Sequence, residues 1–116
     1  MPASAVIVDD HPSFRASARA VLEASGFEVI AEAADGSTAL ELLHRLHPDV
    51  VLLDVQLPDM SGFDVCVECG DVEDTAIILV SSRDGSDFGD LIERCGARGF
   101  IPKADLTGEA IAAFVS

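Results

Sequence analysis

The sequence contains no tryptophan and no tyrosine, and it has only six phenylalanines. Since 49% of its 116 residues are apolar, the core is expected to consist mainly of valine, isoleucine, leucine and alanine. The chain also lacks any apolar stretch near the roughly 20 residues that a helix needs to cross a bilayer. It does not begin with a basic region followed by an apolar run, as a secretory signal does. We therefore expect a cytoplasmic protein with no membrane partner, folded as one domain over residues 1–116.

Basic residues are scarce as well. Seven Lys and Arg stand against 21 Asp and Glu, which leaves a formal net charge of −14. Such a charge repels the phosphate backbone of nucleic acids and anionic lipid surfaces. The sequence also has no segment that we expect to bind DNA. We therefore predict no direct contact with nucleic acid, and protein partners only.

Cysteine and histidine, which often bind transition metals, are few. The three cysteines are an odd number in a chain without a secretion signal, which favours reduced thiols over disulfides. Cys66 and Cys69 have the C-x-x-C spacing of some zinc and redox sites, but no second pair accompanies them and they fall within a predicted helix. Packing is the favoured interpretation, and no role is assigned to the histidines, His11, His44 and His47.

Short apolar runs predict buried strands. Four runs are nearly continuous, as expected for parallel strands covered on both faces: residues 5–8, 50–53, 76–80 and 100–101. A fifth candidate, residues 27–33, alternates Phe27, Val29 and Ala31 with polar or smaller neighbours. This alternation is typical of a less buried strand at the edge of a sheet.

Two clear helical patterns lie between the first three strands. The first covers residues 12–25, with Pro12 suited to a first helical turn and Gly26 suited to ending it. The second is predicted to begin at Asp35 as its cap and to end before Pro48. Both carry an apolar stripe along one face, which indicates packing against a sheet.

Three further helices are predicted, at residues 62–69, 87–95 and 106–115. The second of these is the weakest, because Gly85 and Gly89 lower helix propensity there. Acidic residues follow residues 62–69 and indicate an irregular segment: Asp71, Glu73 and Asp74.

Strand and helix thus alternate five times. This alternation predicts an α/β fold with a doubly wound, five-stranded parallel sheet and right-handed crossovers. In the flavodoxin-like strand order 2-1-3-4-5, the first and third strands are neighbours where the winding reverses. Ligands bind at the carboxyl ends of the strands near this point.

Reactive or charged residues follow four of the predicted strands: Asp9 and Asp10, Asp54, Ser81 and Ser82, and Lys103. Neighbouring carboxylates raise one another's pKa unless a cation lies between them, and Mg²⁺ is the usual hard cation beside phosphates. A carboxylate can also attack phosphorus and form an aspartyl phosphate. Asp54 is best placed for this role, Lys103 to supply a positive charge, and Ser81 to donate a hydrogen bond.

Four segments resemble the receiver domains of two-component response regulators: residues 8–12 (VDDHP), 53–62 (LDVQLPDMSG), 80–82 (VSS) and 100–103 (FIPK). Together they cover the chain in the order and spacing of that family. The VDDHP opening is most similar to receivers attached to LuxR-type helix-turn-helix outputs. The resemblance implies that a histidine kinase or phosphotransfer protein phosphorylates Asp54. It also implies no enzymatic activity beyond the domain's own phosphorylation and dephosphorylation.

The resemblance further implies a metal site and a switch. Asp10 and Asp54 would ligate Mg²⁺, with Asp9 acting through water and Gln56 through its backbone carbonyl. Phosphorylation would then move a hydroxyl and an aromatic ring, Ser81 and Phe100, and change the face that a downstream protein or output domain binds. The sequence departs from many members of the family at the lysine, where Pro102 precedes Lys103 and Ala104 follows it.

Three other interpretations remain open from the sequence. A flavin-binding flavodoxin relative would bind a phosphate after the first strand, where Asp9 and Asp10 would repel it. An aspartyl-phosphate phosphatase typically places its nucleophile after the first strand in an Asp-x-Asp arrangement, whereas position 56 here is Gln. A receiver-like protein-interaction module that is not controlled by phosphorylation would not need Lys103 or the three acidic residues Asp9, Asp10 and Asp54.

Overall fold

A parallel sheet of five strands forms the centre of the protein, in the order β2-β1-β3-β4-β5. The computed structural model describes residues 3–69 and 74–115, so Asp71 and Glu73 of the predicted irregular segment lie outside the described residues. The predicted sheet order is confirmed, and residues 27–33 do form an edge strand. The strands are β1 (Ser4–Val8), β2 (Glu28–Ala33), β3 (Val50–Asp54), β4 (Ala76–Ser81) and β5 (Gly99–Pro102).

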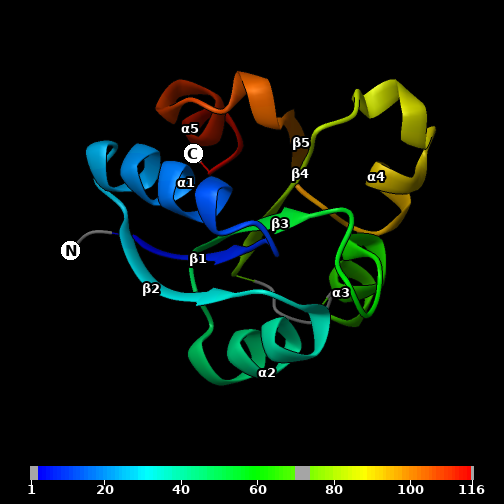
Figure 1. Ribbon diagram of the computed structural model, residues 1–116, viewed down its shortest axis with the longest axis horizontal. Coiled ribbons are helices and arrows are strands. Elements are labelled where there is room, and N and C mark those ends of the chain that lie inside the picture. Colours follow the sequence, from blue (N-terminus) through cyan, green and yellow to red (C-terminus); the bar gives the residue numbers. More distant parts are fainter. Residues whose placement is uncertain (1–2, 70–73, 116) are drawn as a thin grey trace.

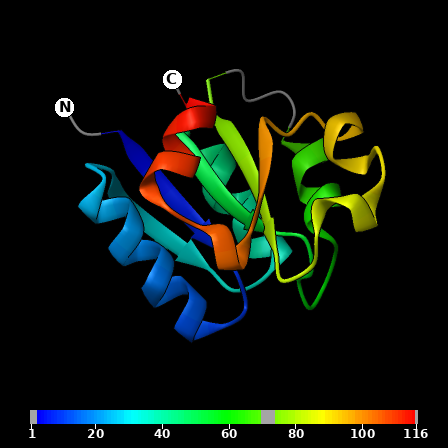
Figure 2. The same ribbon diagram turned by 90° about the horizontal axis from the view of Figure 1, so that it is seen from above.

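Helices cover both faces of this sheet (Figure 1). The helices α1 (Pro12–Ala24) and α5 (Gly108–Val115) lie on one face. On the other face lie α2 (Gly36–Leu46) and α3 (Gly62–Glu68), together with the short α4 (Leu91–Arg94). The view from above in Figure 2 shows the strands running between these two helical layers.

Alternate side chains of each strand enter different cores, as the pleat of a strand requires. Val6 and Val8 of β1 pack toward α2 and α3, while Ala5 and Ile7 pack toward α1 and α5. All four are fully buried. Burial of a Val, Leu or Ile side chain contributes about 1.5–3 kcal/mol, so the inner strands β1, β3 and β4 are held firmly. The residues at their carboxyl ends therefore have fixed positions.

The first two helices begin and end as predicted. Pro12 opens α1, and Gly26 follows it with a φ of 90°, a conformation that glycine adopts without strain. Asp35 caps α2, because its carboxylate accepts a hydrogen bond from the Thr38 amide at 2.8 Å. His47 then ends α2 in the left-handed conformation, at a φ of 48°.

The three cysteines are free and buried. The Cys66 thiol donates a hydrogen bond to the Cys95 carbonyl at 3.3 Å. Burial raises the pKa of the Cys66 thiol above its usual range and that of Cys69 to about 11. These thiols are protonated at neutral pH and unreactive, which agrees with the packing interpretation of the C-x-x-C spacing.

The prediction of one helix over residues 87–95 is wrong. The chain instead forms a 3-10 turn, η1 (Gly85–Phe88), and the single-turn helix α4 (Leu91–Arg94). Gly89 separates them with φ 59° and ψ −127°, a backbone conformation far from the helical region. Both pieces appear in yellow and orange at the right of Figure 2.

The last helix begins two residues later than predicted, at Gly108 instead of residue 106. Leu106 has an extended conformation between the 3-10 turn η2 (Lys103–Asp105) and α5. Thr107 supplies the cap, since its hydroxyl accepts a hydrogen bond from the Ala110 amide at 3.1 Å. Leu106 still packs against the core, so the apolar stripe was correct although the helix boundary was not.

Candidate functional site

The sheet register brings the predicted site residues together at one edge. In the β1–β3 pair Val8 lies opposite Leu53, so Asp9 and Asp54 leave the sheet side by side. In the β4–β5 pair Ser81 lies opposite Pro102, which places Lys103 just beyond it. All these residues follow the carboxyl ends of parallel strands, where ligands bind in sheets of this kind.

Asp9 is completely buried. Its Oδ1 atom accepts a hydrogen bond from the His11 amide at 2.8 Å. Its Oδ2 atom lies 2.7 Å from the Lys103 ammonium, but among the described residues it has no hydrogen-bond partner of good geometry. A buried carboxylate oxygen without a hydrogen bond is costly, so this atom is suited to interact with a further cation or a water.

Lys103 lies between two acidic side chains. Its ammonium is 3.4 Å from Asp54 Oδ2 in addition to its contact with Asp9, and it also lies 4.5 Å from the centre of the Phe14 ring. Burial lowers the pKa of Lys103, but the contact with the Asp9 carboxylate and the charge of Asp54 outweigh this effect and raise the pKa above its usual value. Lys103 is therefore a permanent cation in the site.

Asp54 is 3% exposed, at the end of β3. Its Oδ1 atom accepts a hydrogen bond from the Gln56 amide at 3.2 Å. Burial raises the pKa of Asp54 to about 6, and the charge of Asp9 adds to this effect, while the Gln56 amide and Lys103 oppose it. The Asp54 anion is thus less stable than an ordinary carboxylate, and additional positive charge beside it would be favourable.

Asp10 and His11 complete the acidic cluster. The Asp10 side chain is 37% exposed, and His11 Nδ1 lies 3.1 Å from Oδ1 of both Asp9 and Asp10. One ligand atom from each of Asp9, Asp10, His11 and Asp54 lies within 4.8 Å of the others. No role was predicted for His11 from the sequence. Its position directly after two acidic residues was the available signal.

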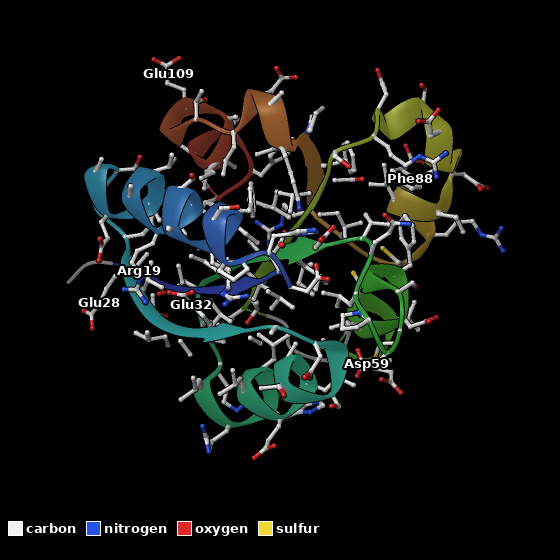
Figure 3. The ribbon with its side chains drawn as sticks, viewed as in Figure 1. Arg19, Glu28, Glu32, Asp59, Phe88 and Glu109 are labelled. Atoms are coloured by element: carbon white, nitrogen blue, oxygen red, sulfur yellow. The ribbon has the colours of Figure 1, made fainter. Side chains whose placement is uncertain are left out.

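The two predicted switch residues are placed as follows. Ser81 is 2% exposed, and its hydroxyl oxygen accepts a hydrogen bond from the Arg83 amide at 3.1 Å. The Phe100 ring lies 5.7 Å from that of Phe88, which in turn lies 5.5 Å from Phe63. Figure 3 labels Phe88 in the η1–α4 region. These aromatic contacts were not predicted from the sequence.

The loop between β3 and α3, which follows Asp54, is held in place by close contacts with β3 and α2. A side chain at Gly62 would overlap the Asp54 carbonyl, so the loop returns to β3 at a distance that only glycine permits. Asp59, labelled in Figure 3, reaches across to α2 and accepts hydrogen bonds from the amides of Gly36 and Ser37 at 2.7 and 3.0 Å. These bonds lower the pKa of Asp59. This contact was also missed.

Comparison with known proteins identifies the family. The model of the response regulator receiver domain matches residues 5–113. The chain belongs to this family. A curated relative, the nitrate/nitrite response regulator protein NarP of Escherichia coli, is 43% identical over 105 residues, which are 88% of this chain and 48% of NarP. The chain spans about half the length of the curated relatives it matches.

Solved receiver structures are similar throughout the chain. A LuxR-family two-component response regulator from Aurantimonas sp. is 31% identical with a TM-score of 0.88, over 99% of this chain and 86% of that one. The signal receiver domain of the putative response regulator NarL from Mycobacterium tuberculosis is 32% identical with a TM-score of 0.86, over 97% and 96%. The predicted resemblance to LuxR-type receivers is thus confirmed. Among the described residues, no helix combines the length and apolarity needed to cross a membrane.

Proposed function

We propose that residues 1–116 act as one phosphorylation-dependent switch, which accepts a phosphoryl group on Asp54 from a histidine kinase or phosphotransfer protein in the cytoplasm. The observation that carries this proposal is the convergence of Asp9, Asp54 and Lys103, with the lysine ammonium 2.7 and 3.4 Å from the two carboxylates. Two buried carboxylates and a half-buried ammonium at the switch point of an apolar sheet have no structural use that apolar residues would not serve better.

The acidic cluster fits Mg²⁺. Mg²⁺ prefers oxygen ligands and keeps several waters, and the cluster offers carboxylates that are close together, one of them with a buried oxygen that lacks a hydrogen bond. We propose that Asp10 and Asp54 are direct ligands, that Asp9 acts through water, and that the Gln56 carbonyl contributes. When bound, Mg²⁺ supplies positive charge that neutralises the oxygens of the incoming phosphoryl group.

The reaction places a new bond between one Asp54 carboxylate oxygen and phosphorus, while the bond from phosphorus to the donor breaks and the donor keeps that electron pair. Lys103 remains protonated and interacts with the growing negative charge as a point charge. The Gln56 amide holds Asp54 Oδ1, which fixes the orientation of the carboxylate before attack. Because these residues act on their own phosphorylation and dephosphorylation only, we propose no other enzymatic activity.

The switch follows from Ser81. Its hydroxyl oxygen accepts a hydrogen bond from the Arg83 amide, so the hydroxyl proton remains available for donation to a phosphoryl oxygen. Movement of Ser81 toward Asp54 would leave space for the Phe100 ring to turn. The contact between Phe100 and Phe88 of η1 would then change. We propose that a downstream protein or an output domain reads this surface, with no direct contact to nucleic acid.

Incubation with acetyl phosphate and Mg²⁺, followed by intact-mass measurement, tests the proposal. We expect the wild-type chain to gain the mass of one phosphoryl group and Asp54→Asn to gain none. Asp59→Asn is the matched control, because Asp59 lies on the loop that follows Asp54 but outside the acidic cluster. This variant is expected to be labelled like the wild type. Equal labelling of Asp54→Asn would contradict the assignment, and absence of labelling in all three chains would favour a receiver-like interaction module.

The metal assignment has its own test. Asp10→Ala removes one proposed ligand at an exposed position, so the fold is expected to remain intact. We expect its labelling by acetyl phosphate to lose most of the Mg²⁺ dependence and to fall at least about tenfold in rate, as loss of a metal contact usually causes. Labelling at the wild-type rate, with the same Mg²⁺ dependence, would place the metal elsewhere.

A further inference from the structure

Arg15 holds the peptide that joins Asp9 to Asp10, and the neighbouring edge strand holds the peptide before it. The Asp9 amide donates a hydrogen bond to the Ala33 carbonyl of β2 at 3.0 Å. The Asp9 carbonyl accepts a hydrogen bond from Arg15 Nη1 at 2.6 Å. Arg15 lies in the first turns of α1, so a helix residue and a strand residue fix the two polar groups of the Asp9 backbone.

Arg15 is itself held by Glu32, the residue next to Ala33 on β2. Arg15 Nε donates to Glu32 Oε1 at 3.1 Å, and the two side chains are 20% and 28% exposed. The other oxygen of Glu32 pairs with Arg19 at 2.7 Å. Figure 3 shows Arg19 and Glu32 close together between α1 and β2. Glu32 therefore pairs with two arginines, and only Arg15 also contacts the acidic site.

The contact between Arg15 and the Asp9 carbonyl lies one peptide bond away from Asp10. The Asp9 carbonyl and the Asp10 amide belong to one planar peptide group, so a bond that fixes the carbonyl also fixes the direction in which the chain enters Asp10. The Asp10 carboxylate has little else to hold it. Among the described residues its one recorded side-chain partner is His11, whose own side chain is 65% exposed.

We propose that Arg15, held by Glu32, is a positioning residue that orients the Asp9–Asp10 peptide so that the Asp10 carboxylate meets a divalent cation. Arg15 does not contact the cation or the phosphoryl group. It acts through the peptide, as residues behind metal ligands commonly do. The inference rests on the proposed function, since it assumes that the acidic cluster binds Mg²⁺.

The test is a Mg²⁺ titration of the full chain without any phosphodonor, in which amide chemical shifts report binding. Arg15→Gln removes the bond to the Asp9 carbonyl. Arg19→Gln is the matched control, because it removes one pair with the same Glu32 and leaves Arg15 in place. We expect Arg15→Gln to raise the Kd for Mg²⁺ about tenfold. Arg19→Gln should leave the Kd within about twofold of the wild-type value, since Arg19 lies outside the metal site. In metal-free protein, the Asp10 amide shift should change in Arg15→Gln only.

A conservative variant separates positioning from fold stability. Arg15→Lys keeps a cation that reaches one acceptor at a time, so its Kd should lie between those of the wild type and Arg15→Gln. If the amide spectrum of Arg15→Gln loses its dispersion, the variant is unfolded and Glu32→Gln replaces it. Glu32→Gln is also expected to raise the Kd for Mg²⁺. A wild-type Kd in a folded Arg15→Gln or Glu32→Gln chain overturns the inference alone. A wild-type chain that binds no Mg²⁺ overturns the proposed function and this inference with it.

Discussion

At the scale of single residues, the site brings buried polar and charged side chains together at one place, where their burial is unfavourable. The buried polar or charged side chains among the described residues are Asp9, Asp54 and Ser81, and all three lie at or directly after the carboxyl end of a strand. Lys103 is the cation that contacts both acids. Burial raises the pKa of Asp54, and one positive charge for two buried carboxylates does not offset this effect. The same imbalance makes the site receptive to a divalent cation.

The raised pKa of Asp54 predicts how the stability of the metal-free protein depends on pH. The folded value is about 6 and the unfolded value 3.8, so the folded state holds this proton between about pH 4 and 6 while the unfolded chain does not. The stability that this group contributes is present below about pH 4 and is lost as the pH rises through 6. Asp54→Asn removes the cost of the buried anion, so it is expected to be more stable than the wild type at pH 7, by about 1–3 kcal/mol.

Urea unfolding at several pH values, in the presence of a chelator, measures this difference. The advantage of Asp54→Asn should be near zero at pH 4, where Asp54 is protonated, and should grow toward pH 7. Mg²⁺ serves as the control, because it should stabilise the wild type by binding the native state and should have much less effect on Asp54→Asn. An advantage that is the same at every pH would contradict the raised pKa.

Sequence reasoning located the acidic residues and the lysine because position after a buried strand is a property of the sequence pattern. It missed His11, Arg15 and Asp59. His11 contacts the two carboxylates directly before it, whereas the side chains of Arg15 and Asp59 reach backbone groups in other segments of the fold. Such contacts depend on the packing of whole elements against one another, and no spacing in the sequence reports them.

At the scale of elements, the segment between β4 and β5 differs from the rest of the fold. The predicted helix over residues 87–95 is replaced by two short turns, and α4 has four residues and no side-chain cap. Helices this short gain little stability of their own. The sequence pattern indicated weakness through Gly85 and Gly89, but it could not show the break, because a glycine in a helical pattern is compatible with either outcome.

The same segment contacts Phe100. The Phe88 ring of η1 packs against the Phe100 ring, and a side chain at Gly85 would approach that ring to 3.1 Å. A rotation of Phe100 would therefore change its contacts with η1. A weakly held element in direct contact with the aromatic ring is able to respond to a small change at the site.

Ser81→Ala tests this coupling. We expect the variant to accept a phosphoryl group on Asp54, at a reduced level, because the hydroxyl is not the nucleophile. Loss of the hydroxyl donor should greatly reduce the amide shift changes of residues 84–106 on addition of acetyl phosphate and Mg²⁺. Ser82→Ala, at the exposed neighbouring position, should retain them. If the wild-type shifts around Asp54 move while those of residues 84–106 do not, the proposed switch does not operate in this chain.

At the scale of the whole molecule, the two cores on either side of the sheet hold the strand ends in register, and the charge governs what can approach them. The apolar pattern was sufficient to predict a parallel sheet, since each inner strand is buried on both faces, and the strand order was taken from the flavodoxin-like arrangement of such sheets. The net charge of −14 opposes contact with other polyanions. A signal from this domain is therefore expected to pass to a protein surface that carries complementary positive charge.

The central claim is that the carboxylate at the end of β3 receives the phosphoryl group. The most direct measurement is to locate that group within the wild-type chain, by fragmentation mass spectrometry after treatment with acetyl phosphate and Mg²⁺. The account predicts that fragments containing Asp54 carry the added phosphoryl group and that a chelator prevents its addition. A phosphoryl group found at another residue, or one added equally without Mg²⁺, would contradict the account.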